Sequence, residues 1–136
     1  MDLNDLKDQL DSDVKIDATK LQWEALNNPV VYSKWLRIYS EAKREIVALE
    51  AKKKKSLKDR LDFYTNRKDD AWNPIEYEKS EMKVVMAADE IIIKLDTKIS
   101  YYSLIVELAA RAMDIIKGRG YAINQAIKIR ELESGK

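Results

Sequence analysis

The sequence predicts an all-α protein built from long helices. Only three glycines and two prolines occur in 136 residues, whereas strand-rich folds need a turn residue about every ten residues. Charged residues make up 36% of the chain, well above the roughly 25% of average soluble domains. Apolar residues also recur three or four positions apart over long stretches, which is typical of amphipathic helices. We therefore predict one helical domain spanning residues 1–136.

Two short helices are expected at the start of the chain. Asp2 is a suitable cap for a first helix in which leucines recur three and four residues apart. Val14 and Ile16 alternate with polar residues, which indicates a brief extended stretch. A second helix is predicted from its cap Asp17 to Asn27.

A long helix is predicted to follow, from the cap Asn28 and the first-position proline Pro29 to about Lys68. Its apolar stripe is interrupted where Lys53 takes the place of the next apolar residue. Residues 69–72 are expected to form a loop. The apolar positions of this helix are Trp35, Ile38, Ala42, Ile46, Leu49, Leu57 and Leu61.

The third long segment carries the most regular pattern. Asn73, Pro74 and Glu76 together resemble a helix start, with a cap, a first-position proline and a glutamate at the third position. The glycines Gly118 and Gly120 are expected to end this helix before a last short one. Apolar residues alternate three and four apart over more than four heptads, a pattern that favours coiled-coil packing: Val85, Ala88, Ile92, Leu95, Ile99, Tyr102, Val106, Ala109, Met113 and Ile116.

Towards its end this segment is apolar on more than one face, because Leu104, Leu108 and Ile115 lie outside the seam. Either other copies of the chain cover the second face, or the N-terminal helices and the segment Tyr121–Leu132 fold back over it. We favour self-association and divide the domain into a part that binds other molecules, residues 1–84, and an oligomerisation part, residues 85–136. The predicted oligomerisation residues are Ile92, Leu95, Ile99, Tyr102, Val106, Ala109, Met113 and Ile116.

Charge is concentrated in one short stretch, although the chain as a whole carries a net charge of only +1. Residues 51–60 contain six basic side chains and one acidic one, Asp59, so this window suits a polyanion. On a helix, Lys53, Arg60 and Tyr64 fall in one sector of about 60° with Arg67, which places an aromatic ring among phosphate-binding cations. A solvated helix face is the alternative. The candidate DNA-binding residues are Lys52, Lys53, Lys54, Lys55, Lys58, Arg60, Tyr64 and Arg67.

Catalysis is not predicted. The sequence contains no cysteine and no histidine, so thiolate chemistry, Cys/His metal sites and the usual general base at neutral pH are excluded. Glycine-rich phosphate loops and carboxylate spacings typical of metal loops are also lacking. We therefore predict no catalytic residues, no metal and no cofactor. No apolar run is long enough to cross a bilayer, and the acidic start does not fit a signal peptide.

Several strings, spread in order over nearly the whole chain, resemble the UvsY family of recombination mediators from T-even-like bacteriophages. One of them, a Leu-Lys-x-Arg-Leu motif, covers residues 57–61. The others are Lys20-Leu21-Gln22 with Asn27-Asn28, Tyr32-Ser33-Lys34-Trp35-Leu36, Tyr77-Glu78-Lys79-Ser80-Glu81-Met82-Lys83, and Ile116-Lys117 with Arg119-Gly120.

This resemblance implies a small, non-enzymatic helical protein that forms closed rings of six or seven subunits through its C-terminal part. It implies binding to single-stranded DNA, to a UvsX-type recombinase and to the phage single-strand-binding protein, in the cytoplasm of the bacterial host. The family's DNA-binding pair falls on Lys58 and Arg60, while Asp59 stands where the family usually has a small residue. Alternatives from other classes are a structural coiled-coil scaffold without DNA binding and an enzyme of a type that we do not name.

Overall fold

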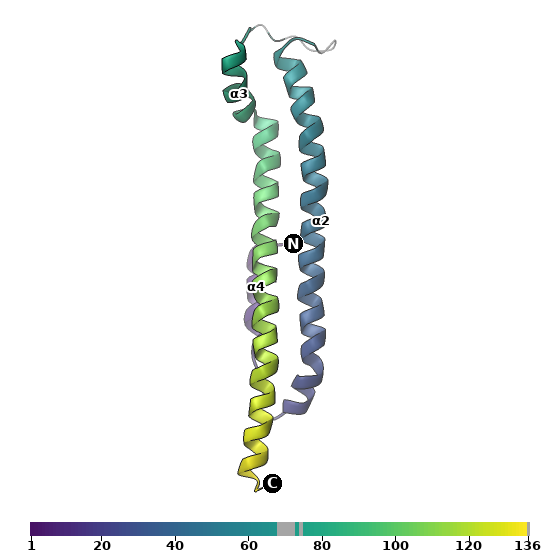
Figure 1. Ribbon diagram of the computed structural model, residues 1–136, viewed down its shortest axis with the longest axis vertical. Helices are drawn as coiled ribbons and strands as arrows, with labels where there is room; N and C mark the ends of the chain where they lie inside the picture. The colour runs from purple at the N-terminus through teal and green to yellow at the C-terminus, as the bar shows by residue number, and fades with distance from the viewer. Residues whose placement is uncertain (68–72, 74, 136) are drawn as a thin grey trace. The chain divides into compact units, whose positions relative to one another are not determined.

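In a computed structural model, residues 1–67, 73 and 75–135 are described, and they form four helices without a strand. The helices are α1 (Leu3–Asp13), α2 (Leu21–Tyr64), α3 (Lys79–Ala87) and α4 (Glu90–Glu133). Figure 1 labels α2, α3 and α4. The four helices confirm the predicted all-α class. Over these residues, none of the helices combines the length and apolar character needed to span a membrane.

The chain divides into two compact units, and each uses part of α2 and part of α4. Unit 1 consists of residues 1–42 and 104–136, and unit 2 of residues 43–103. In unit 1, Trp35, Ile105, Ile116 and Ile123 are fully buried. The indole Nε1 of Trp35 donates a hydrogen bond to Asp13 of α1 at 3.0 Å, so the polar atom of the largest core side chain is satisfied.

A buried polar network also joins distant segments of unit 1. Arg119 donates to Glu24 Oε2 at 2.9 Å, to the Lys15 carbonyl at 2.8 Å and to Asn28 Oδ1 at 2.8 Å. Glu24 Oε2 also accepts the backbone N–H of Asp17 at 2.8 Å. The side chains of Arg119 and Glu24 are only 5% and 6% exposed, so the two charges are compensated by each other inside the unit.

In unit 2, the second half of α2 runs antiparallel to the first turns of α4. Ion pairs join Lys53 to Asp96 and Arg60 to Asp89. Residues further along α2 therefore pair with residues earlier in α4, as expected for antiparallel helices. Ile92 and Leu95 of α4 are buried here. The basic stretch of α2 therefore packs against the start of α4.

The predicted starts of the first two helices are close to those observed. Asp2 caps α1 through a hydrogen bond from the Asn4 backbone N–H at 3.0 Å, which confirms the expected cap. Asp17 instead accepts from the backbone N–H and hydroxyl of Thr19. Its carboxylate closes a turn of the chain, and α2 begins only at Leu21.

The prediction of a helix boundary at Asn28 and Pro29 is wrong, because both residues lie inside α2. The Asn28 side chain does not cap a helix: its Nδ2 donates to the Ile116 carbonyl at 2.9 Å and its Oδ1 accepts from Arg119. These contacts with α4 hold the chain in a helix across a proline that would otherwise destabilise it.

The third long segment is divided differently from the prediction. Asn73 accepts from the Ile75 backbone N–H at 3.2 Å, but helix α3 begins only at Lys79. The expected loop at residues 69–72 lies outside the described residues. The helical structure is then interrupted at Asp89, between α3 and α4. Its Oδ1 accepts the backbone N–H groups of Ile91 and Ile92, so Asp89 caps α4.

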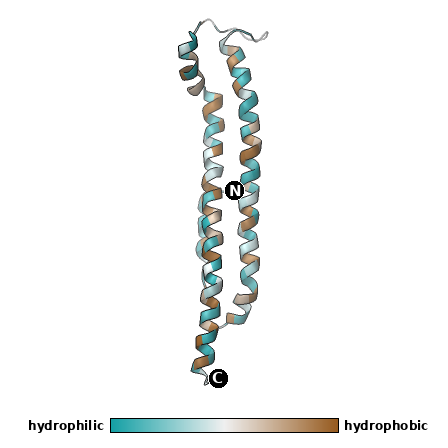
Figure 2. Ribbon diagram, viewed as in Figure 1, coloured by the Kyte–Doolittle hydropathy of each residue, from teal (hydrophilic) through white to brown (hydrophobic). Residues whose placement is uncertain are grey.

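The prediction that Gly118 and Gly120 end a helix is also wrong, because α4 continues through both to Glu133. A Cβ built at Gly120 would lie 2.9 Å from Asn28 Nδ2. The glycine therefore allows α2 and α4 to approach closely in unit 1. Figure 2 shows hydrophobic residues recurring along the whole of α4.

Candidate nucleic-acid interface

The basic stretch of α2 has an inner and an outer side in unit 2. Its inner group, Lys53, Arg60 and Tyr64, lies on the side that packs towards α4 and is half-buried. This is the strip that the sequence placed in one sector. The outer lysines, Lys52, Lys54, Lys55 and Lys58, are all exposed.

The inner group is held by two aspartates of the α4 segment. Lys53 Nζ lies 2.7 Å from Asp96 Oδ1, in a pair whose side chains are 32% and 50% exposed. Arg60 Nε and the Tyr64 hydroxyl both donate to Asp89 Oδ2 at 2.7 Å. The strip that looked uncompensated in the sequence is therefore partly neutralised by α4.

Asp89 is the most buried carboxylate of this region, with a side chain only 1% exposed. Burial by itself raises its pKa, but hydrogen bonds from Arg60, Tyr64 and the Ile92 amide outweigh burial and hold the pKa below its usual value. The bond to Asp89 raises the pKa of Arg60, and burial together with Asp89 raises the pKa of Tyr64. At neutral pH the cluster therefore contains a charged Arg60–Asp89 pair and a neutral Tyr64 hydroxyl.

Aromatic rings surround the Arg60 guanidinium. Its Cζ lies 4.5 Å from the centre of the Phe63 ring and 5.4 Å from that of Tyr64. Tyr64 in turn meets Tyr77 edge-on, with ring centres 6.0 Å apart. Arg67 is exposed beyond the end of α2, where its backbone N–H donates to the Asp62 carbonyl at 2.8 Å.

The outer lysines of α2 are exposed to solvent. Lys58, with a side chain 80% exposed, lies 3.0 Å from Asp62 in an i,i+4 pair, which contributes little to stability. For Lys52, Lys54 and Lys55, no ion pair is recorded with any described residue. Four ammonium groups over seven residues thus form an exposed cationic surface suited to the phosphates of a nucleic acid.

The residues predicted for oligomerisation lie on the side of α4 that packs within the chain. Ile92, Leu95, Ala109 and Ile116 are buried, and Ile99, Tyr102, Val106 and Met113 are half-buried. The single chain already covers much of this seam. Other apolar residues of unit 1 are left exposed.

Two exposed apolar stripes occur in unit 1. The α4 stripe contains Leu104, Ile115 and Ile129, which are 46–53% exposed and share a sector of about 40°. The α2 stripe contains Trp23, Leu26 and Val30, which are 58–80% exposed and are spaced three and four residues apart. Single exposed apolar residues are normal, whereas contiguous exposed apolar patches mark binding surfaces. The α2 residues are neighbours on one helix face, while the α4 residues lie 11 and 14 positions apart.

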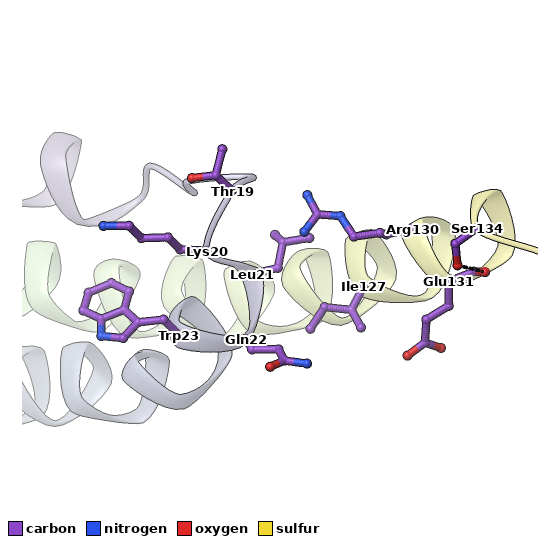
Figure 3. Close-up of a pocket in the computed structure, with 9 residues that line it drawn as sticks. All are labelled: Thr19, Lys20, Leu21, Gln22, Trp23, Ile127, Arg130, Glu131 and Ser134. Carbon is purple, nitrogen blue, oxygen red and sulfur yellow. Dashed lines mark hydrogen bonds between the residues drawn. The ribbon is translucent and has the colours of Figure 1, made fainter. Parts of the chain in front are cut away.

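A groove of about 710 Å³ lies near the α2 stripe, between the start of α2 and the end of α4 (Figure 3). Leu21 and Ile127 supply apolar lining, while Arg130 donates to the Ala18 carbonyl. Glu131 is the single carboxylate among its lining residues, which also include the cations Lys20 and Arg130. Within residues 1–67, 73 and 75–135, no group of three acidic residues is arranged to hold a metal ion.

Sequence reasoning missed Asp89 and Asp96 as partners of the basic strip. One signal was present: an aspartate two residues before the apolar run at residues 91–93 is typical of a helix cap. The uninterrupted heptad spacing concealed it. Asp96 had no comparable signal, because its pairing with Lys53 depends on the register of two helices.

Comparisons with known proteins agree on one family. Residues 9–136 match the family described as recombination, repair and ssDNA binding protein UvsY. The chain is 47% identical over 137 residues to the recombination protein uvsY of Enterobacteria phage T4, and each sequence is covered completely. Crystal structures of the bacteriophage T4 recombination mediator protein UvsY match with TM-scores of 0.88 (46% identity, 98% of both chains) and 0.87 (43% identity, 98% of this chain and 99% of the other).

Proposed function

The chain belongs to the UvsY family of recombination, repair and single-stranded-DNA-binding proteins, and we propose that it acts as a mediator that loads a UvsX-type recombinase. In this role it binds single-stranded DNA, weakens the hold of the phage single-strand-binding protein, and favours the recombinase on the same strand. The work is done by binding rather than by catalysis, in the cytoplasm of the bacterial host.

The exposed outer lysines carry the proposal. Lys52, Lys54, Lys55 and Lys58 offer four ammonium groups to phosphates without reading a base sequence. A loading factor needs this tolerance, because it must act wherever single-stranded DNA is exposed. Arg60 lies beside them and contributes its guanidinium at the inner edge of the surface.

A surface of four or five cations binds weakly by itself. On single strands, log K falls by about 0.7 per neutralised phosphate for each tenfold rise in salt. Several copies on one particle make every contact after the first intramolecular, which can raise the overall affinity by roughly 10²–10⁴. We therefore propose a closed homo-oligomer, for which the resemblance to the UvsY family implies six or seven subunits.

The exposed stripes of unit 1 are the surfaces that we assign to this assembly. Leu104, Ile115 and Ile129 on α4, and Trp23 and Leu26 on α2, remain uncovered in the single chain. Two different stripes suit a head-to-tail contact, in which one surface of each copy meets the other surface of its neighbour and the ring closes. The buried seam then stabilises each subunit rather than the ring.

A salt titration of fluorescent single-stranded DNA tests the DNA-binding surface. Replacing Lys52, Lys54 and Lys55 together by alanine should weaken binding at 0.1 M salt and reduce the salt slope by about 0.7 per lost phosphate contact. The matched control replaces three exposed lysines of unit 1, Lys7, Lys20 and Lys128, and removes the same charge. Equal losses in both triple variants would contradict the assignment.

The assembly is tested by light scattering on Ile115→Asp. This change should give smaller particles, because it places a charge in an apolar contact, and should reduce DNA affinity by the lost multivalency. Lys94→Asp changes an exposed residue of α4 in unit 2 and is the control for mass. An Ile115→Asp protein of parental mass would contradict the assigned surface.

A further inference from the structure

The Asp89 carboxylate makes contacts in two opposite directions. Its Oδ1 accepts the backbone N–H groups of Ile91 at 2.9 Å and Ile92 at 3.2 Å, and its Oδ2 accepts Arg60 Nε and the Tyr64 hydroxyl. Because the first pair is fixed to the backbone of α4, the position of Oδ2 is fixed as well. Arg60 is thus bound to a rigid point and not to a mobile surface acid.

Only one of the five N–H donors of Arg60 is used in this contact. Nε donates to Asp89. The Tyr64 side chain also interacts with the guanidinium, and no further acceptor for Nη1 or Nη2 is found in the part of the chain that is described. The guanidinium is planar, so fixing Nε and packing one face near Phe63 determines where the two Nη groups point. The Arg60 side chain remains 21% exposed. A phosphodiester is the ligand that paired Nη donors fit best.

We infer that Asp89 is a positioning residue for DNA binding, which holds Arg60 by Nε so that its two Nη groups meet a phosphate of the strand. This inference rests on the proposed function, because the phosphate belongs to the single-stranded DNA bound there. Preorganisation improves binding because a long side chain held in its bound geometry loses less entropy when the ligand arrives.

Simple electrostatics makes the opposite prediction. A carboxylate near bound DNA repels it, so its removal should strengthen binding. Positioning predicts that removal weakens binding, since Arg60 loses its orientation. The sign of the change therefore separates the two explanations.

The decisive variant is Asp89→Asn. Asparagine is as good a helix cap as aspartate, so α4 keeps its first turn, but the amide that remains cannot attract the guanidinium as a charge. We expect each subunit to lose one phosphate contact. The salt slope should then fall by about 0.7, and the affinity for single-stranded DNA at 0.1 M salt should fall about fivefold per subunit. Particle mass and helix content should match the parent.

The adjacent residue provides the matched control. Glu90→Gln removes the same charge one residue along from an exposed position, and its DNA affinity should stay the same or rise. Arg60→Ala should lose as much affinity as Asp89→Asn, and the double variant should lose no more than Arg60→Ala alone. Arg60→Lys should fail to restore binding, because lysine keeps the charge but lacks the fork.

The inference is overturned if Asp89→Asn binds as tightly as the parent or more tightly, or if the double variant loses as much again. A parent protein without salt-dependent binding would instead overturn the proposed function, so the two failures are distinguishable.

Discussion

Replacing Glu24 by methionine should destabilise unit 1 strongly, because it leaves the Arg119 guanidinium buried without its charge partner. The two groups lie 2.9 Å apart with side chains 6% and 5% exposed. Arg119 Nε is also buried without a recorded hydrogen bond among the described residues. Its remaining bonds, to Asn28 and the Lys15 carbonyl, do not neutralise the charge.

Removing one partner of a buried pair costs about 3–5 kcal/mol. For a chain of 136 residues, the entropy of unfolding near 60 °C is about 2.1 cal/mol/K per residue, so each kcal/mol lowers Tm by about 3.5 °C. Glu24→Met should therefore melt about 10–17 °C below the parent. Thermal unfolding followed by circular dichroism, at one fixed subunit concentration, measures this shift.

The double variant Glu24→Met with Arg119→Met provides the sharper test. Methionine matches both side chains roughly in length, and an apolar pair often replaces a buried ion pair at little cost. The double variant should thus melt above either single variant. Lys58→Ala, which removes one partner of an exposed pair, should lower Tm by less than about 2 °C. Shifts of the two single variants that simply add in the double variant would refute this account of the pair.

Four further variants test other parts of the fold by thermal or pH-dependent unfolding. Gly120→Ala should lower Tm, because its Cβ would meet Asn28 at 2.9 Å, whereas Gly118→Ala has no atom within 4 Å and should gain about 0.5–1 kcal/mol; equal gains would contradict the close approach. Because the folded-state pKa of Asp89 is lowered, its contribution is complete above the unfolded pKa near 4 and disappears as pH falls through the folded value. Asp89→Asn should therefore lose less stability on acidification than the parent, and an unchanged acid profile would contradict this. Ile105→Ala removes a side chain that is 0% exposed and should cost about 2–5 kcal/mol; a loss below 1 kcal/mol would show that the site is not tightly packed.

The helical class was predictable because it depends on composition and local periodicity. The apolar spacing of α2 and α4 is set by the geometry of the helix itself, and scarce turn residues leave few other folds. The cap Asp2 was likewise predictable, since a cap bonds to residues next to it in sequence.

The errors occurred where a distant contact overrides a local signal. Asn28 resembles a cap and Gly120 resembles a helix end, yet the two lie against each other across unit 1. Asn28 does not cap a helix and Gly120 does not end one, because each contacts the other helix instead. A single sequence does not show which residues of two helices meet. The inner group shows the same limit: Lys53 and Arg60 form a basic strip in sequence, but acids 43 and 29 residues away neutralise it in the fold.

The candidate site was predictable as a region but not as a geometry. The six basic residues within residues 51–60 are visible in the sequence. Which of them point to solvent depends on the helix face that packs against α4. That face is fixed by Asp89 and Asp96, whose roles appear only when the register of α2 and α4 is known.

The composition of unit 1 from the two ends of the chain has a consequence for biosynthesis. The Lys15 carbonyl accepts a hydrogen bond from Arg119, which is synthesised 104 positions later. The Ala18 carbonyl accepts one from Arg130, 112 positions later. At about 5–20 residues per second, translation of that interval takes roughly 5–20 s. Unit 2, by contrast, is one continuous segment, residues 43–103. The nascent N-terminus thus leaves the ribosome long before the residues that it contacts. In a truncated protein that lacks the last twenty residues, the first forty residues would also lose part of their packing.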